Sequence, residues 1–528
     1  MSGFRALLLA LAGVAALTIS GGLGHAQSGT AGLTIFESSS LPPVDVGLRK
    51  WEFEGPRSER LLRERQPQVA SGLVMRVGPS GTPYAAGRVI VKFRDGSSGL
   101  VRAQSMRTAS PTAAVAPRLD YANFDVINID PSEDAEAVAR GLRERPDVEY
   151  AQPEYQMHAL LVPNDPLYRD VQWNMPLINI ERAWDIQPDA GSSITVAVLD
   201  TGVAYTGATI RANILSFRGD NGAIYPAIPN ATIPYSAAPQ LGPSSRFVSP
   251  RDFINGGTTP LDFSGHGTHV SGTIGQTTND GVGTAGVAYN VKIMPVKVIC
   301  GEWDVLFGVP GSQCGTDSQV AQGLRYAADN GAKVINMSIG RSGPPAPVVE
   351  DAMRYAVSKG AFISVAAGND GDEGNPVEVV AEIAGRLPGA VAVAAVDVFK
   401  NQTFYSSFGS YIELAAPGGG GGNDASGYIF QQTFNPDFSD TFQRSVSQYG
   451  APRFDVFAYV GYGGTSMAAP HVSGAAAMLM QQGITDPAAV EEVLERTAVD
   501  LGARGRDDLY GFGLIDVRNA LRGLGLAR

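Results

Sequence analysis

Near the C-terminus the sequence reads Gly463-Gly464-Thr465-Ser466-Met467-Ala468-Ala469-Pro470-His471, a glycine-rich approach to an apolar run that Gly483 ends. The pattern predicts a loop that enters a buried helix, with Ser466 in the first turn and Pro470 early, where a missing N–H costs least. Helix N-termini carry unpaired N–H groups and the positive end of the helix dipole, so they favour an oxyanion that forms there. Taken alone, the stretch is more typical of a core helix that begins with a serine.

Upstream of this helix, buried strands are expected to alternate with helices. Val, Ile and Ala runs without polar alternation are typical of parallel strands that are covered on both faces. The expected strands are residues 194–199, 291–298, 333–339, 361–366 and 390–396, and the expected helices include 317–330, 347–359 and 487–496. This order predicts an α/β fold with a doubly wound, mostly parallel sheet. Two long loops, residues 206–255 and 418–462, interrupt the pattern beside the segments that carry candidate chemistry.

Polar residues suited to catalysis accompany these strands. Parallel sheets place reactive groups at the carboxyl ends of their strands, and Asp200 ends the first one. Glycines flank His266 and leave its ring accessible, whereas His269 and His471 adjoin apolar runs and are expected to be packing residues. Asp200, His266 and Ser466 would supply an orienting carboxylate, a base and a nucleophile. Individually, Asp200 could be a helix cap, and a lone histidine is more often a core residue.

Asn369 follows another expected strand, in Ala367-Gly368-Asn369. A loop asparagine usually makes a turn, but at this edge of the sheet its side-chain N–H could stabilise an oxyanion. The chain order Asp, His, Ser is that of subtilisin, and it differs from the orders of chymotrypsin and the α/β-hydrolases.

At these motifs the chain resembles the subtilisin-like serine proteases, or subtilases. The resemblance rests on Val198-Leu199-Asp200-Thr201-Gly202, Gly265-His266-Gly267-Thr268-His269-Val270, Ala367-Gly368-Asn369 and Gly464-Thr465-Ser466-Met467-Ala468-Ala469-Pro470-His471, within residues 161–523. It implies that Ser466 attacks the scissile carbonyl, that His266 is the general base and that Asp200 orients His266. Asn369 would line the oxyanion hole with the backbone N–H of Ser466. The implied enzyme is a serine endopeptidase that forms an acyl-enzyme and needs no cofactor for the chemistry.

The resemblance also implies a cleft for protein or peptide substrates. Its walls would be formed by Ser338, Ile339, Gly340, Ala367 and Gly368. Such walls pair with an extended peptide as an added strand and leave pockets for alternate side chains. The acidic stretch that begins at Asp370 could border the primary pocket, and the alternative is a solvated loop.

A smaller module precedes the catalytic domain, which is expected to span residues 161–528. Residues 87–160 are expected to contain strands at 88–93, 124–129 and 148–151 and a helix at 132–145, a compact split βαβ unit. The module resembles the subtilase propeptide, a ferredoxin-like α+β chaperone and inhibitor that the enzyme removes by self-cleavage, here between His158 and Pro163. Residues 27–86 are expected to be a linker or leader of unknown role, with a short helix at 58–66.

Composition and the N-terminus bear on the partners and the compartment. Residues 1–26 have the positive start, apolar run and small-residue exit of a secretory signal. No other segment is long and apolar enough to span a bilayer, so we expect a secreted monomer without a membrane anchor. The net charge of −12 argues against a nucleic-acid partner, because no positive excess is available to neutralise phosphates.

Cys300 and Cys314 are the only cysteines of the chain. Export favours a disulfide that closes the loop of residues 301–313. A metal site or two free thiols are the alternatives, although a zinc site is poorly served without a nearby histidine.

The thermitase branch of the family further implies a structural calcium ion. Asp165 matches an aspartate near the mature N-terminus, and residues 277–284 match a loop after the histidine helix in which Asp280 would be the side-chain ligand. The remaining hard oxygen ligands would be the carbonyl groups of Thr277, Val282 and Thr284. One carboxylate is missing, because the family pattern His-Pro-Asp-Leu reads Gly207-Ala208-Thr209-Ile210 here. The long loop that follows could supply a replacement.

Three other functions are weaker interpretations. A catalytically silent subtilase used for binding is unsupported, since all the catalytic residues are present. An ester hydrolase would be expected to carry Gly-x-Ser-x-Gly, and a metalloprotease His-Glu-x-x-His, and neither motif accompanies the candidate residues.

Overall fold

The computed structural model describes residues 35–36, 75–77, 83–117, 121–155, 162–219, 222–420 and 427–522. The chain divides into two compact units, one of residues 43–159 and one of residues 1–42 and 160–528. The expected signal at 1–26, the expected helix at 58–66 and most of the expected cleavage region lie outside the described residues.

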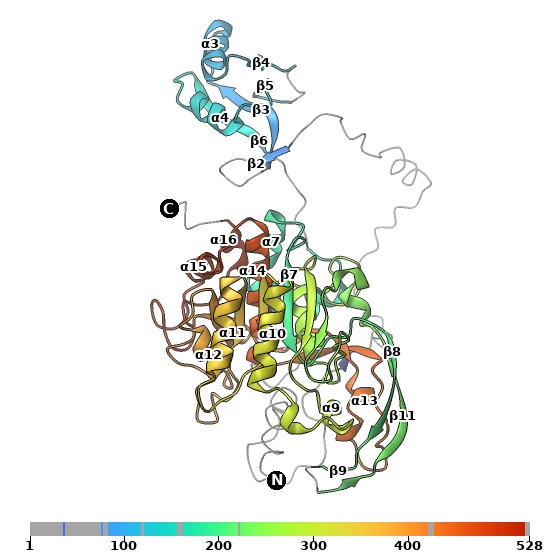
Figure 1. The fold of residues 1–528 in the computed structure, drawn as a ribbon. Helices are drawn as coiled ribbons and strands as arrows, with labels where there is room; N and C mark the ends of the chain where they lie inside the picture. The colour runs from blue at the N-terminus through green and yellow to red at the C-terminus, as the bar shows by residue number, and fades with distance from the viewer. Residues whose placement is uncertain are drawn as a thin grey trace, which may run out of the picture. The chain divides into compact units, whose positions relative to one another are not determined.

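The larger unit is built around a seven-stranded parallel sheet (Figure 1). From edge to edge its strands are β12 (Arg251–Asp252), β13 (Lys292–Lys297), β7 (Thr195–Asp200), β14 (Val334–Met337), β15 (Phe362–Ala366), β16 (Ala390–Val396) and β17 (Leu414–Pro417). The residues of β14 to β17 are all buried, so both faces of the sheet are covered. The five expected strands are confirmed to within two residues at each end. The two edge strands were not predicted, because neither forms a long apolar run.

Helices cover both faces of this sheet. On one face α10 (Asp317–Asp329), α11 (Pro347–Ser358) and α12 (Val379–Ala384) lie side by side (Figure 1). On the other face α8 (His266–Gly275) and α14 (Thr465–Gln481) pack on each other. After α14 the chain forms α15 (Pro487–Thr497) and α16 (Val517–Leu521). Shorter helices include α5 (Pro166–Val171), α6 (Asn174–Leu177), α7 (Ile180–Ile186), α9 (Glu302–Leu306) and α13 (Pro436–Ser439).

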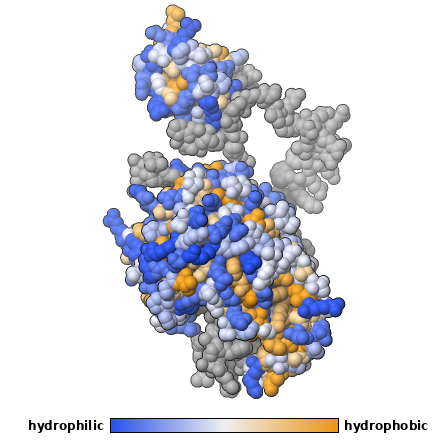
Figure 2. Space-filling model, in the orientation of Figure 1, coloured by the Kyte–Doolittle hydropathy of each residue, from blue (hydrophilic) through white to orange (hydrophobic). Residues whose placement is uncertain are grey.

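The two long loops form one joint structure. In the first loop β8 (Ala208–Ile214) and β11 (Ile228–Tyr235) form an antiparallel hairpin, which β9 (Phe217–Arg218) and β10 (Ile224–Tyr225) extend. In the second, β18 (Ile429–Phe434) pairs with β19 (Phe457–Tyr462), which also pairs with β1 (Ile35–Phe36). The rings of Tyr235, Phe434 and Phe454 pack together, so the loops share a hydrophobic core. Figure 2 shows apolar side chains gathered over this hairpin region.

The smaller unit contains one antiparallel sheet and two helices. Its strands are β2 (Met75–Val77), β3 (Pro83–Phe93), β4 (Ala114–Val115), β5 (Asp125–Asn128) and β6 (Val148–Tyr155), and its helices are α3 (Gly99–Ala109) and α4 (Ala135–Arg143). The three expected strands and the expected helix are present. Helix α3 was missed because it buries only Ser105 and Met106 and has no apolar stripe. Strand β3 begins at Pro83, before the expected start of the module at residue 87.

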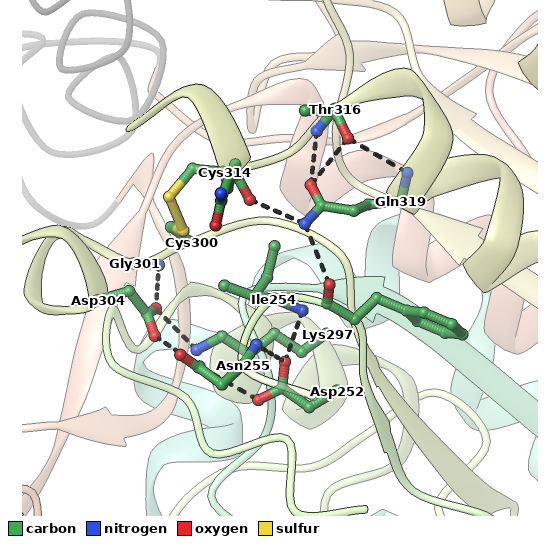
Figure 3. Close-up of a disulfide and its surroundings, with 12 residues drawn as sticks. Asp252, Ile254, Asn255, Lys297, Cys300, Gly301, Asp304, Cys314, Thr316 and Gln319 are labelled. Carbon is green, nitrogen blue, oxygen red and sulfur yellow. Dashed lines mark hydrogen bonds and ion pairs between the residues drawn. A yellow bond between two sulfur atoms is a disulfide. The ribbon is translucent and has the colours of Figure 1, made fainter. Parts of the chain in front are cut away.

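Figure 3 shows the disulfide between Cys300 and Cys314, which confirms the predicted pairing. Beneath it Asp304 forms a buried ion pair with Lys297, with 2.7 Å between Oδ2 and Nζ. Buried ion pairs require further hydrogen bonds to offset desolvation, and here the backbone N–H of Gly301 also donates to Asp304. The disulfide and this pair together anchor the loop that carries α9.

Candidate active site

The fold brings Asp200, His266 and Ser466 to the carboxyl edge of the parallel sheet. Asp200 is the last residue of β7, His266 is the first residue of α8, and Ser466 is the second residue of α14. All three side chains are buried. The Nδ1 atom of His266 lies 2.7 Å from Oδ1 of Asp200. A ring that donates through Nδ1 leaves Nε2 free to accept a proton.

The close contact between α8 and the end of β7 depends on Gly267. A methyl group added at this position would lie 2.1 Å from the carbonyl oxygen of Gly202 and 3.1 Å from Oδ1 of Asp200. The glycines around His266 were expected to expose its ring, yet His266 is only 6% exposed. The close approach of the helix to the strand is the physical reason for the glycine at 267.

Asp262, which the sequence analysis did not identify, connects the two segments that carry Asp200 and His266. Its fully buried carboxylate accepts five hydrogen bonds, one from the Thr201 hydroxyl, two from the Ser264 and Gly265 amides, and two from the amide and hydroxyl of Thr268. The Asp262 carboxylate therefore links Thr201, which follows Asp200, to the start of α8. An aspartate shortly before a helix is a recognisable capping signal, but its contact with Thr201 is a tertiary feature.

Nearby carboxylates control the charge of His266. Burial alone would lower the pKa of His266, but the charge and hydrogen bond of Asp200 and the charges of Asp262 and Glu302 raise it above its ordinary value. The site is therefore suited to holding a proton on His266 while a reaction proceeds.

Ser466 is tied to Ser338, the residue after β14. The Ser466 hydroxyl donates to the Ser338 carbonyl at 3.2 Å, and the Ser338 hydroxyl donates to the Ser466 carbonyl at 2.7 Å. Within the described part of the chain no hydrogen bond joins Ser466 to His266. Catalytic hydrogen bonds are often long before substrate binds, and here the Ser466 hydroxyl is directed to the Ser338 carbonyl instead.

Pro470 explains why the Ser338 hydroxyl is needed. It was expected early in the helix, where a missing N–H costs least, but as the sixth residue of α14 it lies inside the helix. In an α-helix the N–H of residue 470 would donate to the carbonyl of Ser466, and proline has no N–H. The hydroxyl of Ser338 supplies the missing hydrogen bond to this carbonyl.

Asn369 follows β15 and faces the start of α14. Its Oδ1 accepts hydrogen bonds from the amide of Thr465 at 2.8 Å and from the Thr465 hydroxyl at 3.0 Å. Because both bonds use the amide oxygen, the Nδ2 group of Asn369 is turned toward other partners. The backbone N–H of Ser466 lies in the first turn of α14, where no intrahelical acceptor exists.

Among the described residues of this unit, the other histidines, His269 and His471, are packing residues, as predicted. His269 is fully buried, lies 3.0 Å from the Val460 carbonyl and stacks on Tyr462. His471 lies 2.8 Å from the carbonyl of Met467. Burial lowers the pKa of His269 to about 3 and that of His471 to about 4.

The two expected cleft walls follow neighbouring strands. Ser338 to Gly340 come after β14, and Ala367 and Gly368 come after β15, which pairs with β14 in parallel. The Gly368 amide donates to the Thr465 hydroxyl at 3.1 Å, which places this wall next to the start of α14.

Asp165 lies against the loop that carries Asn279 and Asp280. The Asn279 amide donates to Asp165 at 2.7 Å, and the Asp280 amide lies 3.3 Å from it. Burial raises the pKa of Asp165 above its usual range, the nearby Asp280 carboxyl adds to this rise, and the two amides oppose it. The structure therefore brings Asp165 and Asp280 together.

The long loop after residues 207–210 returns to the neighbourhood of Asp280. Ala208 begins β8, so residues 207–210 enter the inserted hairpin. The chain returns to this region in the 3-10 turn Pro239–Leu241, where the Gln240 carbonyl accepts a hydrogen bond from the amide of Thr277 at 2.9 Å. Gln240 is 7% exposed, its Nε2 lies 3.4 Å from Oδ2 of Asp280, and its Oε1 has no hydrogen-bond partner.

A third acidic cluster lies away from these residues. One carboxylate oxygen from each of Glu413, Glu491 and Glu495 lies within 4.8 Å of the others. Burial, with the charges of Glu491 and Glu495, raises the pKa of Glu413 to about 9. The cluster is therefore partly protonated at neutral pH.

Comparisons with known proteins identify related sequences and structures. A sequence profile of the Subtilase family matches residues 191–513, and a profile of the fervidolysin N-terminal prodomain matches residues 75–154. An extracellular protease of Xanthomonas campestris pv. campestris is 31% identical over 78% of this chain and 68% of its own length. Thermitase of Thermoactinomyces vulgaris is 30% identical over 65% of this chain and 94% of its own length. A solved protease structure from Pseudoalteromonas arctica PAMC 21717 is 28% identical, with a TM-score of 0.50, and covers 69% of this chain and 99% of that protein.

Proposed function

Because the chain belongs to the subtilase family of serine proteases and carries a prodomain of the fervidolysin type, we propose that it is a secreted endopeptidase that processes its own precursor with Ser466, His266 and Asp200 as catalytic triad. The observation that carries the proposal is the buried contact of 2.7 Å between His266 and Asp200, beside the start of the helix that bears Ser466. Secretion is supported by the relative named an extracellular protease. Of the described helices, none is both long and apolar enough to cross a membrane.

The proposed reaction begins with Ser466. Its Oγ attacks the carbonyl carbon of the scissile bond while Nε2 of His266 takes the hydroxyl proton. The tetrahedral intermediate collapses to an acyl-enzyme, and His266 gives the proton to the departing amine. A water molecule then releases the acyl group, with His266 again accepting and returning a proton. Asp200 fixes the tautomer of His266 and stabilises the imidazolium throughout.

Negative charge on the carbonyl oxygen requires preorganised donors. Asn369 is suited to this role because Thr465 holds its amide oxygen, which leaves Nδ2 as the free donor. The backbone N–H of Ser466 is the second donor. Because Thr465 adjoins Ser466, the same residue positions both donors.

The N-terminal prodomain is proposed to inhibit the enzyme until self-cleavage. Its profile match ends at residue 154, and the Pro-rich segment near Pro163 lies between it and α5. The expected substrate is an extended peptide that lies between the segments Ser338–Gly340 and Ala367–Asn369. Autocleavage between His158 and Pro163 would release a catalytic domain that contains all the proposed site residues.

Asp165 and Asp280 are proposed to hold a structural calcium ion, with Gln240 in place of the missing carboxylate. The fit rests on the buried Oε1 atom of Gln240, which has no partner. Rotating this amide by half a turn would bring its oxygen toward Asp280, and the two ends of a glutamine amide are close to isosteric. Two carboxylates and an amide oxygen are ligands that suit calcium. Bound calcium would stabilise the folded catalytic domain and takes no part in the proposed reaction.

We expect a fluorophosphonate that reacts with activated serines to inhibit peptide hydrolysis and to label Ser466. The reagent forms a phosphonate ester with Oγ and releases fluoride, which requires the nucleophile to be activated by its base. Mass spectrometry of the digested protein should place the added mass on the peptide that contains Ser466. The same protein unfolded in denaturant is the control and should stay unlabelled. Full activity after stoichiometric labelling would contradict the proposal.

Removal of calcium should lower the melting temperature of the catalytic domain. A ligand at a hundredfold excess over its Kd stabilises the folded state by about 2.7 kcal/mol. The measurement is calorimetry of Ser466→Ala protein, which avoids self-digestion, with calcium or with a chelator. Asp280→Asn and Gln240→Leu should each reduce the calcium-dependent shift. Asp397→Asn is the matched control, because Asp397 also accepts backbone amides in a turn, and its shift should equal that of the parent. An equal shift in all the variants would exclude this site.

A further inference from the structure

We propose that Glu378 determines the substrate preference of this protease and selects a basic side chain, lysine or arginine, on the residue whose carbonyl Ser466 attacks. The inference rests on the proposed function, because it requires a peptide to lie between the segments Ser338–Gly340 and Ala367–Asn369. These two segments are referred to below as the cleft walls.

The side chain of Glu378 reaches both cleft walls. A methyl group added to Gly340 would lie 2.5 Å from Oε2 of Glu378, and one added to Gly368 would lie 2.4 Å from its Cγ. The two glycines therefore leave the space that the Glu378 side chain occupies. Gly368 directly precedes Asn369, the proposed oxyanion donor, so the carboxylate lies at the wall next to the reacting carbonyl.

One oxygen of the Glu378 carboxylate is buried without a hydrogen-bond partner. Glu378 is only 7% exposed, and its Oε2 atom has no hydrogen-bond partner. It precedes α12 at the N-cap position, but its side chain does not cap that helix. A buried carboxylate oxygen without a partner is costly, and such groups call for an explanation. A cation that arrives with the substrate would supply both the missing hydrogen bond and the opposite charge.

Among the described residues, none forms an ion pair with Glu378. The nearest candidate, Arg341, directs its guanidinium to Asp317 through two hydrogen bonds of 2.8 and 2.7 Å. Asp370, on the loop after β15, adds negative charge on the same side. The negative charge of Glu378 and Asp370 can therefore interact with a positively charged ligand.

The protonation of Glu378 agrees with this role. Burial, with the charge of Asp370, raises the pKa of Glu378 to about 7, while the amide and the guanidinium of Arg341 oppose the rise. Tyr411, the other titratable group close by, has its own pKa raised by burial and by Glu378, so it stays neutral. A bound lysine or arginine favours the ionised carboxylate, and an apolar side chain favours the protonated form.

The residue proposed to set this preference differs from the one that the sequence suggested. Asp370 was considered as the acidic residue that borders the primary pocket. Asp370 remains half-buried and its amide contacts the Ser407 hydroxyl at 3.3 Å, whereas Glu378 contacts both cleft walls. Glu378 stands nine residues after Asn369 and belongs to no recognised motif, so the sequence offered no signal for it.

The test compares peptides that differ only in the residue before the scissile bond, with arginine, lysine, glutamine or leucine at that position. Wild-type enzyme should have its highest kcat/KM with arginine or lysine. Glu378→Gln should lower kcat/KM for the arginine peptide by about 10²-fold, the size expected when one member of a desolvated charge pair is removed. The leucine peptide should change less than about threefold. Glu378→Asp should retain part of the preference for arginine.

Two further measurements distinguish an effect on substrate specificity from a general effect on the structure of the enzyme. In wild-type enzyme, the arginine-to-leucine ratio of kcat/KM should rise with pH through about 7, because Glu378 must ionise to bind the cation. In Glu378→Gln the ratio should be independent of pH. Asp370→Asn is the control with the same loss of charge, and it should reduce the ratio less than Glu378→Gln does. A ratio unaffected by Glu378→Gln, with the leucine peptide still cleaved, would overturn this inference alone. Failure to cleave any of the four peptides would instead count against the proposed function.

Discussion

A precursor that carries Ser466→Ala is expected to stay full length under conditions in which the wild-type precursor shortens to a chain that begins near Leu161. Removal of Oγ eliminates the nucleophile, and no neighbouring group can replace it, because Ser338 uses its hydroxyl to bind the Ser466 carbonyl. In this family the loss of the catalytic serine lowers kcat by about 10⁶-fold. The measurement is a time course of the purified precursor by mass spectrometry, followed by an assay on casein.

The control for this experiment is Ser358→Ala. Ser358 is an exposed residue at the end of α11, so the same chemical change there should leave processing and hydrolysis at the wild-type rate. Adding a trace of active enzyme to the Ser466→Ala precursor should restore cleavage in trans, which shows that the precursor is folded and cleavable. If the alanine variant matured alone as fast as the wild type, the assignment of Ser466 would fail.

Replacing Asp200 by asparagine is expected to lower kcat by about 10⁴-fold with little change in KM. An asparagine preserves the shape of the side chain but can present its N–H to the imidazole, which then holds the wrong tautomer. The loss of charge also removes a group that raises the pKa of His266. Since His266 must be neutral to accept the Ser466 proton, the acid limb of kcat/KM should move to lower pH in this variant.

The measurement is the pH dependence of kcat/KM on a peptide substrate for both proteins. Asp486→Asn is the matched control, because Asp486 caps α15 at an exposed position and asparagine preserves that cap. That variant should keep the wild-type rate and pH profile. An unchanged acid limb in Asp200→Asn would mean that Asp200 does not set the protonation of His266.

Much of the fold could be predicted because its signals are local. The strands of a parallel sheet that is covered on both faces are apolar along their whole length, so residues 195–200 and 390–396 are recognisable without their neighbours. The edge strands β12 and β17 are short, and the pairing with β13 or β16 defines them more than their own residues do. Helix α3 was missed because it has no apolar stripe, so its own residues give little signal for a helix.

The candidate site divides in the same way. Asp200, His266, Asn369 and Ser466 stand in short glycine-marked motifs, and the structure places them on neighbouring elements at one edge of the sheet. The residues that position these side chains stand in no recognisable sequence motif. Asp262 joins two segments that lie about sixty residues apart, through bonds to Thr201 and to the start of α8. Gln240 lies next to Asp280 because the chain returns to this region after the inserted hairpin, which ends with β11.

By itself, therefore, the sequence determined the family of this protein, the positions of its central strands along the chain and the identity of the catalytic candidates. Motifs of this kind are legible because a reaction imposes residue types at fixed local spacing. Only the tertiary structure showed that the Ser338 hydroxyl donates to the Ser466 carbonyl, in place of the N–H that Pro470 lacks. It also showed that the Glu378 carboxylate lies between the cleft walls. Those relations depend on distances between segments that are remote in the chain, and no local spacing encodes them.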